Sequence, residues 1–167
     1  MTFPQLPEEP PGRDGDSGGG RDGERRAVEV YAPTIDAPAQ DLPRLEKWLT
    51  YVAARHGRRL HTLTYVLLSD EELHAMNVEH LGHDTLTDII TFDLRDEPGR
   101  GPIEGECYVS LERVRDNAAG FGESPARELR RVMAHGLLHL CGLSDKTEPE
   151  AARMRAAEEE ALRTYPG

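Results

Sequence analysis

Two histidines one helical turn apart, followed by a glycine and an aspartate, most constrain how this chain can fold. His135 and His139 lie in the stretch His-Gly-Leu-Leu-His-Leu-Cys-Gly-Leu-Ser-Asp, which ends at Asp145. Residues four apart on a helix share one face, and Gly142 can adopt the left-handed conformation that ends a helix and turns the chain back. The spacing therefore predicts that Asp145 returns toward the two imidazoles.

This arrangement is typical of a metal site rather than of two partly buried polar residues on an apolar helix. The offsets match the metzincin pattern, with Asp in the place of the last His. Three N/O ligands leave a fourth coordination position for water, which is typical of catalytic zinc. We therefore predict one zinc ion per chain, bound by His135, His139 and Asp145, in a zincin-like hydrolytic site at the C-terminal end of a helix.

The residue after the first histidine separates two classes of hydrolase. Zincin metallopeptidases have a glutamate there, which serves as the general base. This chain has Gly136, which has no side chain that could accept a proton. Peptide hydrolysis by the usual zincin route is therefore disfavoured.

Hydrophobic periodicity and helix-end signals predict the element order βαβαββααα. Ser69 with Glu72, and Thr147 with Glu150, form capping boxes at two helix starts. The predicted strands are 27–31, 61–68, 88–94 and 105–110, and the predicted helices are 41–56, Ser69 to near Gly82, Ser110 to near Gly120, Ser124 to Gly142, and Thr147 to about Arg163. This pattern predicts an α+β fold, a small mixed sheet of about four strands packed with about five helices.

Composition divides the chain into a tail and one domain. Residues 1–26 are dominated by Pro, Gly and charged residues, so they cannot bury enough apolar surface to offset their ordering entropy. We expect a disordered tail over 1–26 and a single metal-dependent hydrolase domain over 27–167.

Net charge and cysteine content limit the partners of the protein and the compartment in which we expect it. The formal net charge is −11, which is not expected of a nucleic-acid-binding protein, since such domains are generally basic. A local basic patch stays an open alternative, and we expect no DNA partner. The chain has two cysteines, too few for a disulfide framework, and no apolar run that approaches the roughly 18 residues of a membrane helix. We expect a soluble cytoplasmic protein with no membrane partner.

At this point the motifs resemble one known family. The segment from His135 to Gly142, HGLLHLCG, resembles the HGxLHLxG motif of the YbeY family of bacterial endoribonucleases. Upstream, Asn77, Asp84 and residues 87–92, TDIITF, resemble the family's N…D..T(D/N)VLSF segment, and GECYVS at 105–110 is similar to its GDIxIS strand. Together these matches cover about residues 27–163 in the family's order.

The resemblance implies a cytoplasmic, zinc-dependent endoribonuclease that cuts single-stranded RNA. It also implies a role in maturation of the 3′ end of the small-subunit (16S) rRNA and in ribosome quality control, with the ribosomal small subunit as a partner. Two alternatives stay open: a metallopeptidase with an unusual base, against which Gly136 argues, and a non-catalytic ribosome-associated module with a structural metal.

The chain departs from the family pattern at two positions. Most members have His where this chain has Asp145, and many have Arg where this chain has Leu81, after His80. A carboxylate ligand makes zinc-bound water less acidic than a neutral imidazole does. Leu81 cannot contact a phosphate, so one expected substrate contact is missing.

Several further residues are candidates for the site. Asp88 either orients a ligand or the water, or simply begins a strand, and Ser110 either lines the pocket or caps a helix, which we favour. His83 is a candidate for positioning RNA. For Arg127, Arg130 and Arg131, we favour a solvated helix face over phosphate contacts.

Overall fold

The computed structural model describes residues 26–81 and 87–166. Nine elements follow in the predicted order. The strands are β1 (Val28–Tyr31), β2 (Leu60–Leu68), β3 (Ile89–Asp93) and β4 (Ile103–Ser110), and the helices are α1 (Leu42–Arg55), α2 (Asp70–Leu81), α3 (Leu111–Phe121), α4 (Pro125–Leu140) and α5 (Glu148–Arg163). The prediction of an α+β fold with a four-stranded mixed sheet and five helices is confirmed for the described residues.

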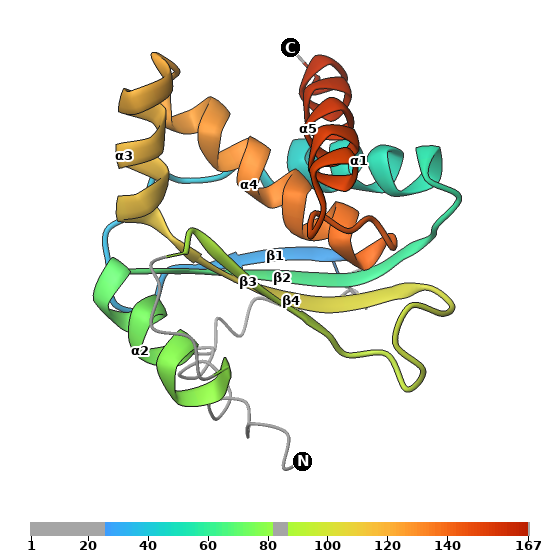
Figure 1. Cartoon of the computed structure of the whole chain (residues 1–167), viewed down its shortest axis with the longest axis horizontal. Coiled ribbons are helices and arrows are strands. Elements are labelled where there is room, and N and C mark those ends of the chain that lie inside the picture. Colours follow the sequence, from blue (N-terminus) through green and yellow to red (C-terminus); the bar gives the residue numbers. More distant parts are fainter. Residues whose placement is uncertain (1–25, 82–86, 167) are drawn as a thin grey trace, which may run out of the picture.

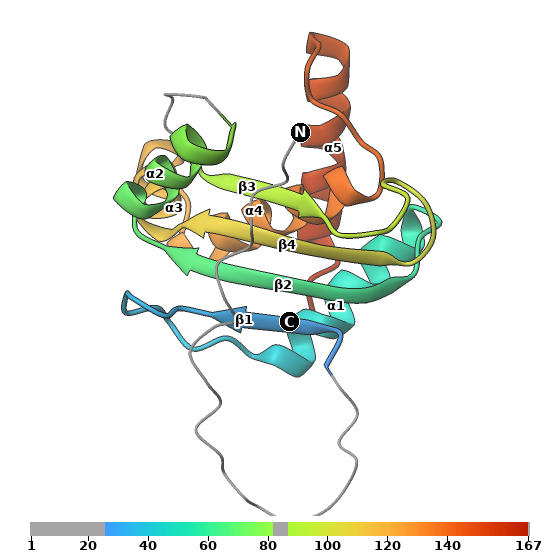
Figure 2. The same cartoon turned by 90° about the horizontal axis from the view of Figure 1, so that it is seen from below.

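The sheet has the strand order β1-β2-β4-β3. β1, β2 and β4 run parallel, whereas β3 pairs antiparallel with β4. Helices α1, α4 and α5 cover one face of the sheet, and α2 lies against the other (Figures 1 and 2). Within the described residues, no helix is both long and apolar enough to cross a lipid bilayer.

The two faces of β4 show why the sheet has two layers of packing. Cys107 and Val109 belong to the large core beneath α1, α4 and α5. Tyr108, which points to the opposite face because strand side chains alternate, belongs to a smaller cluster with Leu73 of α2. The ring of Tyr108 meets that of Phe92 edge to face at 5.7 Å.

Helix α4 lies unusually close to the sheet because of a glycine. A Cβ atom added to Gly136 would stand 2.8 Å from Cys107 Sγ and 2.9 Å from Ile89 Cδ1, closer than van der Waals contact allows. Gly136 is therefore a packing residue on the sheet side of α4. This close approach fixes the height of α4, and hence of its histidines, above β3 and β4.

Helix ends follow the sequence signals with one difference. The side chains of Ser69, Ser124 and Thr147 accept hydrogen bonds from the backbone N–H groups three residues ahead. Helix α3, however, continues past Gly120 and ends at Gly122, which has a φ of +66°. The left-handed conformation of Gly122, which glycine adopts without strain, ends the helix two residues beyond Gly120, near which the sequence predicts the end.

Candidate metal centre

The two histidines and the aspartate converge as the sequence predicts. His135 Nε2 and His139 Nε2 are 3.0 Å apart. Asp145 Oδ2 lies 3.4 Å from each of these nitrogens. One ligand atom from each residue thus faces a common point, and the three residues form a group that could hold a metal ion.

Asp145 reaches the histidines because the chain turns sharply after α4. Gly142 has a φ of +103°, and Leu143 N–H donates back to the carbonyl of Leu138 at 3.0 Å. This bond satisfies a carbonyl of the last helical turn, as in the glycine-ended helices of many proteins. The turn also places the carbonyl of Leu143 3.0 Å from His139 Nδ1.

The hydrogen bonds at the two Nδ1 atoms determine which ring nitrogens are free. Glu158 Oε2 lies 3.0 Å from His135 Nδ1, and the Leu143 carbonyl accepts from His139 Nδ1. Both partners are acceptors, so each neutral imidazole carries its proton on Nδ1 and presents a lone pair at Nε2. Two lone pairs and a carboxylate that meet at one point repel one another unless a cation lies between them.

The spacing of the three atoms fits such a cation. Ligands about 2.0–2.2 Å from a tetrahedral zinc ion stand roughly 3.3–3.5 Å from one another. The observed separations of 3.0 and 3.4 Å lie close to this range. The residues present therefore fit a small divalent ion with nitrogen and oxygen ligands.

A cavity of about 550 Å³ opens beside His135 and Asp145, between α3, α4 and α5. His135, Asp145 and Asp88 line it. Burial raises the pKa of the Asp88 carboxyl, and the nearby His135 offsets this effect only in part. Burial alone would lower the pKa of His135, but the hydrogen bond and charge of Glu158 raise it overall.

The other two candidate residues, Asp88 and Ser110, lie in different surroundings. Asp88 faces the cavity, and its backbone carbonyl accepts from Ser110 N–H at 2.9 Å. The Ser110 hydroxyl accepts from Arg113 N–H at the start of α3 and donates to Asp70. The helix-cap interpretation of Ser110 is therefore confirmed, and its hydroxyl is used in the cap.

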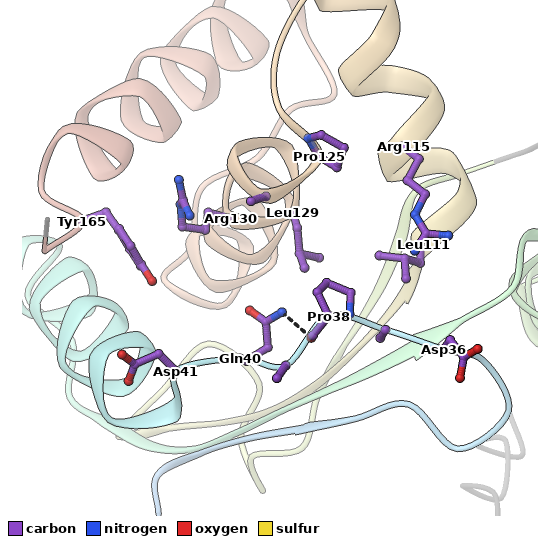
Figure 3. Close-up of a pocket in the computed structure, with 13 residues that line it drawn as sticks. Asp36, Pro38, Gln40, Asp41, Leu111, Arg115, Pro125, Leu129, Arg130 and Tyr165 are labelled. Atoms are coloured by element: carbon purple, nitrogen blue, oxygen red, sulfur yellow. Dashed lines mark hydrogen bonds between the residues drawn. The ribbon is translucent and has the colours of Figure 1, made fainter.

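The expectation of a solvated arginine face does not hold. Arg127 and Arg131 both form ion pairs with Glu159. The guanidinium of Arg130 lies over the ring of Tyr165, 4.3 Å from its centroid, beside a separate cavity between the start of α1, α3 and α4 (Figure 3). The reason is tertiary, since α5 and the C-terminal residues pack along this side of α4.

Glu158 is the residue that the sequence analysis missed. Only 8% of it is exposed, although it lies in a run of three glutamates. Its position between the buried residues Met154 and Ala161 of α5 is the signal that could have found it, because an acidic residue on the apolar stripe of a helix needs a partner.

Some predicted positions fall outside the described residues. These are the tail up to residue 25 and His83, within residues 82–86. The same holds for the side chains of His80 and Leu81, so the substitution of Leu81 for the family's Arg has no structural account.

Comparison with known proteins identifies the family. A sequence profile described as endoribonuclease YbeY matches residues 34–166. The chain is 44% identical to the endoribonuclease YbeY of Flavobacterium johnsoniae, over 71% of this chain and 83% of that protein. It is 37% identical to that of Parabacteroides distasonis, over 84% of this chain and 96% of that protein.

A solved structure agrees with this assignment. The solution structure of a protein from Thermotoga maritima superimposes with a TM-score of 0.54 at 25% sequence identity. The match covers 81% of this chain and 89% of the Thermotoga chain. The family profile spans most of the chain and includes the three converging side chains, so this chain belongs to the endoribonuclease YbeY family.

Proposed function

We propose that this protein is a zinc-dependent endoribonuclease that cuts single-stranded RNA in the cytoplasm. We further propose that it acts in maturation of the 16S rRNA 3′ end and in ribosome quality control, on the ribosomal small subunit. The convergence of His135, His139 and Asp145 on one point, in a member of this family, carries the proposal.

The bound ion would polarise a scissile phosphodiester and make a water nucleophilic. The protein's part is to fix the ligands and to handle protons. Asp88 is our candidate for the proton-transfer group, because it lines the same cavity as His135 and burial raises its pKa. A carboxyl with a raised pKa can both accept and return a proton closer to neutral pH. Ser110 is the weaker candidate, since its hydroxyl caps α3.

The packing of Gly136 disfavours the peptidase alternative. A side chain at this position would meet Cys107 and Ile89 in the sheet. A glutamate there would therefore collide with the sheet instead of reaching a substrate. The second alternative, a purely structural metal, is disfavoured by the cavity beside His135 and Asp145, since structural zinc sites are closed by four protein ligands.

The test combines metal analysis with two cleavage assays. Purified wild-type protein should contain about one zinc per chain and should cut an unstructured RNA faster than the corresponding duplex. The His135→Ala, His139→Ala double variant should lose both the metal and the cleavage. Casein should stay intact in the presence of the wild type.

Each contrary outcome has a definite meaning. Equal RNA cleavage by the double variant would trace the activity to a contaminating ribonuclease and remove support for the proposal. Casein hydrolysis by the wild type, lost in the double variant, would favour the peptidase. Metal binding without cleavage of any RNA would favour the structural role.

A further inference from the structure

We infer that Glu158 of α5 is a positioning residue for the metal centre. It holds His135 in the ring orientation and tautomer in which Nδ1 carries the proton and Nε2 faces His139 and Asp145. The inference rests on the metal centre of the proposed function and extends it to a residue outside the ligand set.

The contact itself is specific. Glu158 Oε2 lies 3.0 Å from His135 Nδ1, and the Glu158 side chain is only 11% exposed. A buried carboxylate accepts hydrogen bonds and strongly favours a proton on the facing nitrogen. This bond therefore both orients the imidazole and makes its Nε2 the basic atom, as partners beyond the ligand shell do in metal sites generally.

Glu158 is in turn held by α4. Arg131 Nη1 lies 3.8 Å from Glu158 Oε1, the carboxylate oxygen that does not contact His135. Arg131 is itself fixed by a bond of 2.5 Å to Glu159 and by an ion pair with Glu128. Since Arg131 precedes His135 by about one turn of α4, both contacts of the carboxylate come from the same helix.

His139 does not need a carboxylate partner, so the role of Glu158 is specific to His135. The Nδ1 of His139 is bonded to the Leu143 carbonyl of its own helix end. His135 lies one turn earlier, where the backbone carbonyls are engaged in the helix. A carboxylate from a second helix supplies the acceptor instead, so α5 is required for a complete site.

Three variants of Glu158 distinguish the effect of side-chain length from the effect of charge. Glu158→Asp keeps the charge but is one methylene too short to hold the same contact, whereas Glu158→Gln keeps the reach and an accepting oxygen. Glu158→Met removes both. Glu160→Gln is the matched control, because Glu160 lies in the same run of glutamates on α5 but is exposed and pairs with Arg163, outside the contacts of His135 and Arg131.

The readouts are zinc affinity, by competition with a chromophoric chelator, and the NMR signal of the His135 Nδ1 proton in the zinc-loaded protein. We expect Glu158→Met and Glu158→Asp to weaken zinc binding about 10- to 100-fold. Glu158→Gln should recover a large part of this loss. The Nδ1 proton should exchange slowly in the wild type and fast in the Met and Asp variants. Glu160→Gln should match the wild type in both measurements.

The outcomes separate this inference from the proposed function. If the wild type binds no zinc, the metal centre and this inference both fail. If the wild type binds zinc and all three Glu158 variants bind it equally well, only the role of Glu158 is refuted. An equal loss in Glu160→Gln would show a general effect of charge on α5 and would also overturn the inference. If Glu158→Met does not fold, as judged by circular dichroism, the comparison of Glu158→Asp with Glu158→Gln still tests the inference.

Discussion

At the scale of single residues, this site depends on what each side chain faces. Gly136 lies against the sheet, where a side chain would collide with Cys107, while His135 and His139 face away from the sheet toward Asp145. One helix therefore presents a packing face and a ligand face through adjacent residues. This division explains why the position after the first histidine is unavailable for a catalytic base.

Asp145 is the ligand whose replacement is most informative. Asp145→Ala should weaken zinc binding strongly, because the oxygen that lies 3.4 Å from both Nε2 atoms is removed. Asp145→Asn should weaken it less, and Asp145→His should keep or strengthen it, since imidazole is a good zinc ligand. Competition with a chelator measures all three. Unchanged affinity in Asp145→Ala would remove this residue from the ligand set.

The close approach at Gly136 gives a second prediction. Gly136→Ala should lower the free energy of unfolding by about 1–3 kcal/mol, the usual cost of overpacking a core. The added methyl group must displace Cys107 Sγ and Ile89 Cδ1. Urea denaturation measures the change. Gly120→Ala is the control, because Gly120 lies in the last turn of α3 and a Cβ there meets nothing within 4 Å. A stable Gly136→Ala protein would refute the packing role.

At the scale of elements, α4 and α5 form the site together. α4 supplies the two histidines and α5 supplies Glu158, while the loop between them supplies Asp145. The start of α5 therefore determines the path of the loop that carries Asp145. It also determines the rotational position of Glu158 on the helix. Thr147 marks this start, since its hydroxyl accepts from Glu150 N–H and donates to the Glu150 carboxylate.

Loss of this cap should affect both stability and metal binding. Thr147→Ala should reduce the free energy of unfolding by about 0.5–2 kcal/mol, the usual range for an N-cap. It should also weaken zinc binding, because loss of the cap frays the first turn of α5, and the loop with Asp145 leads directly into that turn. Ser124→Ala, which removes the cap of α4 far from the loop, is the comparison. We expect it to lower stability by a similar amount and to leave zinc affinity nearer the wild-type value.

At the scale of the whole molecule, the candidate metal centre lies on the helical side of the sheet. The sheet is covered by helices on both faces (Figure 1), and the metal centre lies at the end of α4, where this helix meets α5. The large core extends from β1 at one edge of the sheet to α5.

We predict that residues 1–25 are dispensable for folding and zinc binding. They offer few apolar residues to bury, and β1 begins only at Val28. A protein that starts at residue 26 should melt within a few degrees of the full chain and bind zinc equally well. A large fall in the melting temperature would show that the tail packs on the domain.

The sequence alone was enough for the element order, the caps and the three converging side chains, since these depend on local spacing. Periodicity defines a helix face, and Gly142 determines where the chain turns back toward His135 and His139. Glu158 could not be assigned in this way, because its partner His135 is 23 residues away on another helix. The apolar stripe of α5 indicates which glutamate of the run at 158–160 is buried, but only the packing of α5 on α4 determines which residue that glutamate contacts. The same packing converts Arg131 from an expected solvated residue into the support of Glu158, since burial of a charge depends on what surrounds it in three dimensions.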